Sequence, residues 1–400
     1  MPTTSNHRAR LLAAAVVLAG LALVAGACSS DDDASGTSST TSTTTNQAVP
    51  VVKAGEDDAA FRGPGPFEVG VTTLSLPDRK VEVWYPARTG STEGKPAATY
   101  SQLDALPPSL AAAAPALLPK DVSPDVLVVT MDGTVRDVPG STNGPFPLVL
   151  FSHGFGSYRL DASHLLRGIA SWGFVVAAPD HIERGRAAVV SGTATSDTPK
   201  DVQVLLDTIP LVAGAGGPLQ GLTDTSKVAA VGHSAGGRAA LTALSEPQIG
   251  VAVGWAAAGR EPGPAPHKPS MNIAAKEDIL VPLPEVRQTF AGLSTPKRLV
   301  VIAGAGHNSF TDICQAVKAG NDLIGLAQRI GIPLPDELAK GGKDGCGPDS
   351  IDTALGWQIT QHFTVAELRD GLGLDKVPVG LGQDVTKEFA APIEYVQDLG

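Results

Sequence analysis

The sequence is poor in cysteine, in aromatic residues and in positive charge. Of its 400 residues only three are cysteines, and 4% are aromatic. So few cysteines exclude a small disulfide-rich scaffold and a site built from four thiolates. Acidic residues outnumber basic ones, 41 to 30, giving a formal net charge of -11. This charge argues against a nucleic acid or an anionic membrane surface as main partner, because both would repel the folded body.

Motifs for nucleotides and catalytic metals are also missing from the chain. There is no H-E-x-x-H, no G-x-x-x-x-G-K-[ST] and no paired-cysteine ligand set, and the glycine-rich GAGGPLQG lacks the spacing of a dinucleotide fingerprint. We therefore expect no metal and no cofactor.

The amino-terminal stretch is typical of an export signal. His7, Arg8 and Arg10 precede an apolar run over 11–25, which is short for a transmembrane helix. The run ends in Ala-Gly-Ala followed by Cys28, which resembles the lipobox of bacterial lipoproteins. We predict a lipoprotein signal peptide over 1–27, a lipidated Cys28 and a protein anchored to the outer face of the cell membrane. The alternatives are an ordinary signal peptide and an uncleaved anchor.

Residues 28–60 are rich in Ser, Thr and Asp, and their apolar side chains are too few to offset the entropy of ordering. We predict a flexible tether, so that only the lipid anchor contacts the membrane. With Cys28 lipidated, Cys314 and Cys346 remain, and an exported protein is free to join them in a disulfide. Two free buried thiols are the alternative.

Residues 61–400 read as one α/β domain, in which strands alternate with helices. This pattern predicts a mostly parallel central sheet with helices on both faces. FEVGVTTLSL and KVEVWYP predict an antiparallel hairpin at the amino-terminal edge. The further strands are expected in PLVLFSHG, FVVAAPD, KVAAVG, IGVAVGWAAA, MNIAAKED and, as the last, KRLVVIAGAGH; helices are expected near 162–172, 200–212, 237–244 and 351–368. Irregular insertions at 100–124, 260–269 and 313–350 are expected to shape the mouth of a site.

The stretch VAAVGHSAGGRAAL contains a G-x-S-x-G pattern centred on Ser234. Five letters decide little in a chain with 45 glycines, but an apolar run precedes them and a helical pattern follows. In that context the glycines at 232 and 236 relieve crowding, so that Ser234 projects from the top of the sheet as a nucleophile. A structural turn serine is the alternative.

A serine nucleophile needs a base, and the base needs an orienting carboxylate. Asp278 and His307 each follow a predicted strand, and the chain order Ser, Asp, His is that of nucleophile-elbow enzymes. Glu277 is the alternative to Asp278. We expect His153 and His233 to orient the backbone, and His164, His181, His267 and His362 to be ordinary structural residues.

Taken together, PLVLFSHGFG, SWGFVVAAPDH, DTSKVAAVGHSAGG, AKEDILVP and AGAGHNSF resemble the α/β-hydrolase superfamily over residues 67–372. The resemblance points to its platelet-activating-factor acetylhydrolase-like and cutinase-like polyester hydrolase branches. It implies the α/β-hydrolase fold, with Ser234 as nucleophile, His307 as general base and then acid, and Asp278 fixing the tautomer of His307. The backbone amides of Phe155 and Ala235 would form the oxyanion hole, which needs two fixed N–H donors.

These expectations define a serine carboxylic ester hydrolase that works through an acyl-enzyme. Short acyl esters, phospholipid-type esters and polyesters are candidate substrates, and Trp255 either lines the acyl pocket or is an ordinary buried tryptophan. Ala235 stands where the family often has a bulkier residue, which leaves the shape of that pocket open. An acyltransferase with the same triad, or a surface-binding lipoprotein on a hydrolase scaffold, are the alternative functions. A histidine base predicts ester cleavage that rises through roughly pH 6 to 7.

Overall fold

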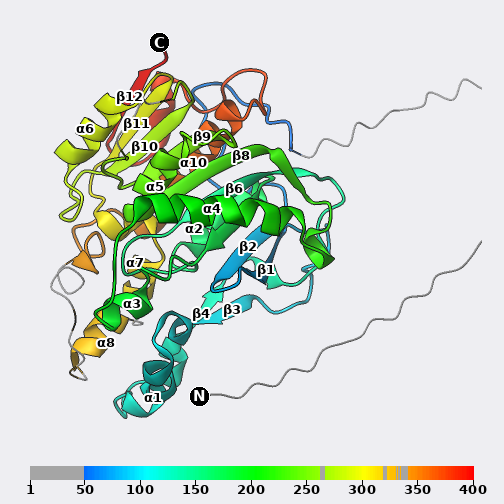
Figure 1. Ribbon diagram of the computed structural model, residues 1–400. Coiled ribbons are helices and arrows are strands. Elements are labelled where there is room, and N and C mark those ends of the chain that lie inside the picture. The colour runs from blue at the N-terminus through cyan, green and yellow to red at the C-terminus, as the bar shows by residue number, and fades with distance from the viewer. Residues whose placement is uncertain (1–48, 262–265, 319–321, 330, 332–333, 335–340) are drawn as a thin grey trace, which may run out of the picture. The chain divides into compact units, whose positions relative to one another are not determined.

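A computed structural model describes residues 49–261, 266–318, 322–329, 331, 334 and 341–400 (Figure 1). The predicted signal peptide, Cys28 and most of the tether lie outside these residues. Residues 50–60 pack on the domain, since the carbonyl groups of Gly55 and Glu56 accept hydrogen bonds from the amides of Gly380 and Gly382. The domain therefore begins before residue 61, and the predicted boundary is wrong in this respect. None of the described helices is long and apolar enough to span a bilayer.

The described chain forms one large mixed sheet. Its ten strands lie in the order β12-β11-β10-β9-β8-β6-β7-β2-β1-β5, and the central strands from β7 to β11 are parallel. The strands are β1 (Val69–Ser75), β2 (Lys80–Pro86), β5 (Thr134–Arg136), β6 (Phe146–Ser152), β7 (Val175–Pro179), β8 (Thr223–His233), β9 (Ile249–Trp255), β10 (Ser270–Ala275), β11 (Lys297–Ile302) and β12 (Ile393–Asp398). A separate pair joins β3 (Ala98–Ser101) to β4 (Val128–Met131).

Helices cover both faces of the sheet, as predicted. On one face α2 and α10 share an apolar core with β6, β9 and β10. On the other face α4 and α5 pack on β6 and β8, and α6 covers β10 and β11. Figure 1 shows α4 and α5 in front of the sheet. The helices are α1 (Pro108–Leu117), α2 (Ser163–Ser171), α3 (Arg186–Val190), α4 (Thr198–Ala213), α5 (Ala235–Ala243), α6 (Leu283–Gly292), α7 (Ile313–Lys318), α8 (Leu323–Arg329) and α10 (Thr353–Gly371), with 3-10 turns η1 (Gln102–Ala105), η2 (Pro124–Leu127), η3 (Gly217–Leu219), η4 (His307–Phe310) and η5 (Gln383–Glu388).

Antiparallel pairs occur toward both ends of the sheet, although the edge strand β5 is parallel to β1. The amino-terminal hairpin β1–β2 is antiparallel, as predicted, and β2 is also antiparallel to β7. The prediction that β11 is the last strand is wrong, because β12 adds an antiparallel edge beyond it. Most residues of β12 are only half-buried, so its sequence lacks the continuous apolar run that marked the central strands.

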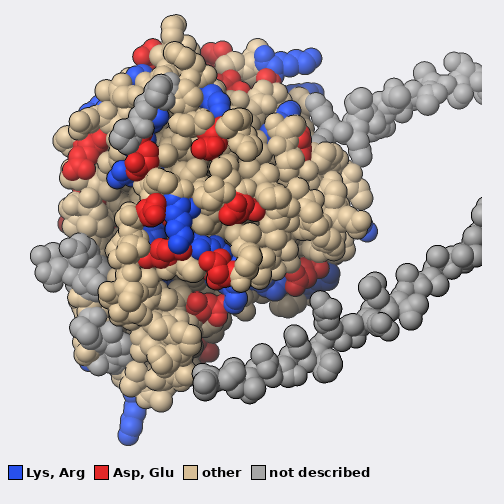
Figure 2. All heavy atoms as spheres, viewed as in Figure 1, with Lys and Arg blue, Asp and Glu red and all other residues tan. Residues whose placement is uncertain are grey.

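Two of the three predicted insertions, at 100–124 and 313–350, gather at one end of the domain. Figure 1 shows α1, α3, α7 and α8 grouped there, beyond the carboxyl ends of the parallel strands. Leu103 and Leu118 of the first insertion pack with Leu326 of α8. Over this end the surface in Figure 2 is mostly uncharged, whereas acidic and basic side chains intermingle nearer the middle of the view. The insertions at 100–124 and 313–350 therefore build an apolar enclosure on the edge of the sheet where a site is expected. The prediction for the insertion at 260–269 is wrong, because its described residues lie along α5, where Glu261 accepts from Arg238 and Lys268 donates to the carbonyl of Leu244.

Candidate active site

Ser234 occupies a strained turn between β8 and α5. Its backbone has φ 56° and ψ -122°, a conformation that is unfavourable for any residue with a side chain. A Cβ atom on Gly232 would overlap the carbonyl of Gly236, and one on Gly236 would overlap the carbonyl of Ser152. The two glycines of the pattern are therefore required by close backbone contacts, and the turn holds Ser234 at the top of the strand.

Asp278 and His307 form a hydrogen-bonded pair beside this turn. The Nδ1–H of His307 donates to Oδ2 of Asp278 at 2.8 Å, and both residues are buried. The other oxygen, Oδ1, accepts the amides of Leu280 and Val281 at 2.8 and 2.7 Å. A carboxylate fixed in this way keeps the proton of the ring on Nδ1 and leaves Nε2 as a base.

Of the two candidate acids, only Asp278 contacts the imidazole in the described structure. The carboxylate of Glu277 instead accepts the amide of Gly304 at 2.7 Å. Ser234 and His307 line the same cavity. The structure thus brings the serine and the imidazole to one cavity and pairs the imidazole with the aspartate.

Asp344, which the sequence does not predict as a site residue, binds the backbone at His307 and at the residue after Asp278. Its Oδ2 accepts the amides of His307 at 2.8 Å and of Ile279 at 3.1 Å, while its carbonyl accepts the amide of Asn308 at 2.9 Å. No local pattern signals this role, because Asp344 is a single acid in a glycine-rich segment. The nearby Cys346 is joined to Cys314, which confirms the predicted disulfide.

The loop after β6 presents Phe155 to the cavity. Phe155 lies between Gly154 and Gly156, lines the cavity, and leaves half of its side chain exposed. Ala235 is the first residue of α5, and amides in the first turn of a helix have no acceptor within the helix. The two predicted oxyanion donors thus follow β6 and β8, which are neighbours in the sheet.

A buried network of hydrogen bonds around Arg184 holds the loop after β6. The guanidinium of Arg184 donates to the carbonyl of His153, to Oγ of Ser152 at 2.9 Å and to Asp201 at 2.7 Å. The carbonyl of Arg184 accepts the amide of Gly156 at 2.8 Å. Arg184 therefore forms hydrogen bonds with this loop both before and after Phe155.

The same network contains a second serine, histidine and aspartate set. Nε2 of His181 accepts from Ser152 at 2.8 Å, and its Nδ1 lies 2.8 Å from Asp201. Burial, and then the charge of Arg184, lowers the pKa of His181 to about 4. Ser152 and His181 are fully buried and do not line the cavity. A substrate cannot reach them, so the set is structural.

His153 and His233 act on the backbone, as predicted. His153 donates to the carbonyl of Gly154 at 2.9 Å and accepts the amide of His181 at 2.9 Å. His233 donates from Nε2 to the carbonyl of His307 at 2.9 Å. Burial is the main cause that holds the pKa of both rings well below the usual value, and for His153 the charge of Arg184 adds to it. They are neutral spacers that fix the loops around the site.

The prediction that Trp255 lines an acyl pocket is wrong. Its side chain is fully buried, packs against Phe151 with ring centroids 5.4 Å apart, and donates from Nε1 to Thr364 at 2.9 Å. The alternative, a core tryptophan, is what the structure contains. Its carbonyl does serve the site, because it accepts the amide of Ser234 at 2.8 Å.

The remaining histidines differ in position. His267 is exposed, and His362 is buried between α10 and the amino-terminal segment, where it accepts the amide of Phe61 at 3.2 Å. His164 was predicted to be an ordinary helix residue, yet it lines the cavity and stacks on Trp357 at 3.9 Å. Within the described part of the chain, no group of three or more His, Cys, Asp or Glu residues could hold a metal.

The cavity at Ser234 has a volume of about 640 Å³ and mostly apolar walls. Its walls come from the loop after β6, from the insertion at 100–124 including α1, from α3, and from α7 and α8. A cavity of this size accommodates a drug-sized organic molecule. The arrangement can therefore hold an apolar molecule with a reactive group at a serine, an imidazole and a pair of amides.

Comparisons with known proteins agree with this fold. A family model described as chlorophyllase matches residues 114–257. A platelet-activating factor acetylhydrolase from Cavia porcellus is 28% identical over 167 residues, which cover 30% of this chain and 38% of that relative. A ferulic acid esterase from Streptomyces cinnamoneus has a similar structure, with a TM-score of 0.56 at 20% identity, covering 86% of this chain and 100% of the other.

These matches agree with the expected resemblance, since one of the similar proteins is an acetylhydrolase and another is an esterase. The assignment to an acetylhydrolase-like or a cutinase-like branch stays a prediction. The chain matches well under half the length of the acetylhydrolase, and the likeness to the esterase shows a shared fold. The family model includes Phe155, Ser234 and Ala235 but ends before Asp278 and His307. The pairing of Asp278 with His307 therefore rests on the hydrogen bond between them.

Proposed function

We propose that this member of the α/β-hydrolase superfamily is a serine carboxylic ester hydrolase that works through an acyl-enzyme. The observation that carries the proposal is the pairing of His307 with Asp278 at the wall of the cavity that also exposes Ser234. Relatives named as an acetylhydrolase and an esterase support the same chemistry.

In the first half-reaction Nε2 of His307 takes the proton of the Ser234 hydroxyl while Oγ attacks the ester carbonyl carbon. The carbonyl oxygen becomes an oxyanion and accepts hydrogen bonds from the amides of Phe155 and Ala235. The carbon–oxygen bond to the alcohol then breaks, and His307 returns its proton to the departing alkoxide. Asp278 stabilises the imidazolium during this step and stays ionised.

In the second half-reaction a water molecule takes the place of the alcohol. His307 accepts a proton from the water as it attacks the acyl carbon, and the same two amides bind the second oxyanion. The bond from Oγ to the acyl carbon breaks, and His307 returns the proton to Ser234. The acid is released and the enzyme is restored.

The substrate class rests on the cavity and on the relatives. Apolar walls favour an ester with a sizeable apolar part, and acyl, phospholipid-type and polyester substrates all carry one. If an alcohol enters in place of water, the same residues perform acyl transfer. Product analysis with and without added alcohol separates the two activities.

A fluorophosphonate probe tests the proposal, because it phosphonylates an activated serine. We expect a stoichiometric label on the peptide that carries Ser234, loss of the label in Ser234→Ala, and retention in Ser226→Ala, which changes an exposed serine of the same strand. Folded protein that takes no label would contradict the proposal and favour a surface-binding protein on a hydrolase scaffold.

We further propose that the protein is exported and anchored to the membrane through lipid on Cys28. The support is the apolar run followed by Ala-Gly-Ala-Cys in the sequence. Metabolic labelling with palmitate should mark the wild type and leave Cys28→Ser unmarked. Equal labelling of the two proteins would overturn this location.

A further inference from the structure

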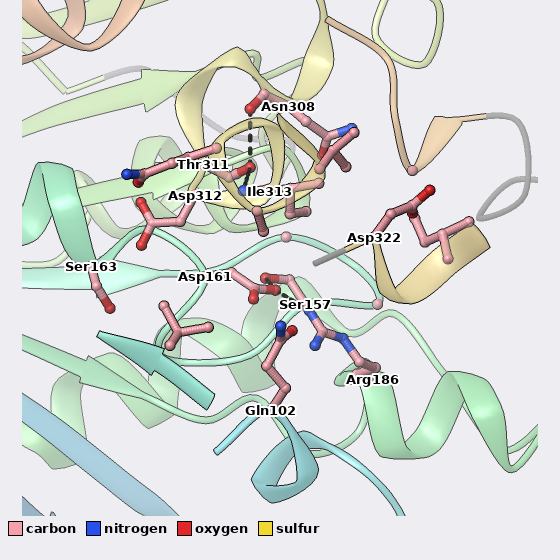
Figure 3. A pocket seen from close by; sticks show the side chains of 18 of the residues that line it. Gln102, Ser157, Asp161, Ser163, Arg186, Asn308, Thr311, Asp312, Ile313 and Asp322 are labelled. Carbon is pink, nitrogen blue, oxygen red and sulfur yellow. Dashed lines mark hydrogen bonds and ion pairs between the residues drawn. The ribbon is translucent and has the colours of Figure 1, made fainter. Parts of the chain in front are cut away.

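Several polar side chains line the apolar cavity, and four of them form a group that we call the polar cluster: Gln102, Ser157, Asp161 and Arg186 (Figure 3). Oδ2 of Asp161 accepts the hydroxyl of Ser157 at 2.7 Å and NH2 of Arg186 at 2.6 Å. Arg186 also lies over the ring of Tyr158, 4.8 Å from its centroid. The guanidinium is thus fixed in place, and its second amino group is left free to bind something else.

Two donors of the cluster lack a partner in the described structure. The NH1 group of Arg186 and Nε2 of Gln102 are buried, and neither has a hydrogen-bond acceptor among the described residues. Gln102 is only 8% exposed, and its amide points toward Asp161 and Arg186 in Figure 3. A buried donor without an acceptor costs roughly 1–3 kcal/mol, so an acceptor atom that enters the cavity here would be bound.

The cluster is continuous with the reaction centre through one loop. Gly154, Phe155, Gly156 and Ser157 follow each other along the cavity wall, and the amide of Ser157 donates to the carbonyl of Gly154 at 3.3 Å. A substrate whose ester lies at Phe155 and Ser234 therefore extends its apolar part through the same cavity that holds the cluster.

A neighbouring carboxyl does not supply the missing acceptor. Asp312 also lines the cavity, and its two oxygens accept the amide of His164 at 3.3 Å each, at the start of α2. Burial raises the pKa of Asp312 well above its ordinary value. Asp312 therefore binds the amide at the start of a helix, and the donors of Gln102 and Arg186, two residues that line the same cavity, have no acceptor among the described residues.

We propose that the polar cluster is a specificity subsite for a second oxygen atom of the substrate, carried on its apolar part and separate from the ester that is cleaved. The preferred substrates are then esters with a hydroxyl or similar oxygen function some distance from the scissile bond, rather than plain hydrocarbon esters. Gln102 and Arg186 donate to that oxygen, and Asp161 and Ser157 hold Arg186 in position. This inference rests on the proposed ester hydrolase activity.

Paired substrates test the inference. Methyl esters of straight-chain acids from butanoate to decanoate, each with and without a terminal hydroxyl group, are compared by kcat/KM on the full chain. We expect at least one hydroxylated ester to be preferred over its hydrocarbon partner by about tenfold or more, because a site built to bind a hydroxyl rejects an analogue without it.

Variants then assign the preference to the cluster. Gln102→Leu and Arg186→Lys should each bring the ratio of the two kcat/KM values toward one, since each removes a free donor. Gln203→Leu makes the same chemical change on an exposed part of α4 and should keep the wild-type ratio. Arg186→Lys keeps the positive charge beside Asp161, so it remains informative if Gln102→Leu does not fold.

The outcomes separate this inference from the proposed function. If all the esters are cleaved without preference for any hydroxylated partner, or if the ratio survives both substitutions, the subsite is overturned while the hydrolase stands. If no ester is cleaved and Ser234 takes no fluorophosphonate label, the hydrolase itself fails, and the subsite fails with it.

Discussion

At the scale of single residues, the site depends on a few side chains that are each held by more than one hydrogen bond. Asp278 uses one oxygen for the imidazole of His307 and the other for two backbone amides. Its proposed role in catalysis is therefore one of orientation as well as charge. A substitution that keeps the shape of the Asp278 side chain but removes its charge tests its effect on the imidazole without unfolding the protein.

We expect Asp278→Asn to lower kcat by roughly a thousand- to ten-thousand-fold, because an amide at this position favours the wrong tautomer of the imidazole. Glu277→Gln is the matched control, since it neutralises the neighbouring acid and keeps an oxygen acceptor for the amide of Gly304. Steady-state kinetics on an activated ester measures both. Equal losses in the two variants would show that the assignment of the acid is wrong.

The residues that sequence could predict are those with a strong local context. Ser234 was predictable because glycines surround it where an apolar strand turns into a helix. Asp344 was not, because its hydrogen bonds reach back to His307 and Ile279 from a distant insertion. Trp255 stayed open between the acyl pocket and the core, because its position at the end of a strand does not decide which face of the sheet the side chain takes.

At the scale of elements, the active-site loops are held in place by segments that do not touch the cavity. Arg184 binds the loop after β6 through its side chain and its carbonyl, and Asp201 of α4 holds the guanidinium. Since Phe155 lies in that loop, the position of one proposed oxyanion donor depends on Arg184.

We predict that Arg184→Lys lowers kcat by about tenfold to a hundredfold, because a displaced oxyanion donor loses part of the stabilisation it gives to the transition state. The change in KM should be much smaller, since the cavity walls remain. Arg79→Lys is the control: Arg79 is also buried and paired, with Asp78 and Glu183, and it does not contact the loop. If both variants lose the same kcat, Arg184 has no special effect on the loop.

The order of strands and helices in the central sheet followed from the sequence because buried parallel strands are continuous apolar runs. The elements that were missed are short or half-exposed. β5 has three residues, and β12 is a half-buried edge strand. Such segments gain their structure from pairing with a neighbour, which a local pattern does not encode.

At the scale of the whole molecule, the domain buries several histidines in neutral form. Burial is the main cause that lowers the pKa of His164, His181 and His362 to about 4. It also lowers the pKa of His153 and His233 well below the ordinary value. Each of these rings binds its proton more readily in the unfolded chain than in the folded one.

The free energy of unfolding should therefore fall as the pH is lowered from about 6.5 toward 4, because the unfolded state then binds more protons. Two buried acids oppose the trend, since burial raises the pKa of Asp312 and brings that of Glu367 to about 7. Because five histidines oppose two acids, we expect the denaturant concentration at the unfolding midpoint to be higher at about pH 7 than at about pH 5.

His362→Gln should flatten this dependence, because it removes one buried titrating ring at a position outside the cavity. The expected change in slope is at most about 1.4 kcal/mol per pH unit. A wild-type midpoint that stays constant or rises as the pH falls would show that the buried histidines do not govern acid stability.

The insertions shape the cavity, and the central sheet positions the reacting groups. The carboxyl ends of β6, β8, β10 and β11 lie at one edge of the sheet. They are followed by the loop that contains Phe155, by Ser234, by Asp278 and by His307. The insertions enclose the space above them, and one of them also anchors His307 through Asp344. The proposed reacting groups thus follow strands of the sheet, whereas the insertions supply much of the apolar wall around them.

The covalent intermediate itself gives the most direct test of the proposed chemistry. Full-length protein mixed with p-nitrophenyl acetate and quenched in acid within the first turnover should gain the mass of one acetyl group, and fragmentation should place that group on Ser234. His307→Ala should lack the adduct. Steady ester cleavage by Ser234→Ala at the wild-type rate, or an acetyl group on a different residue, would contradict the account.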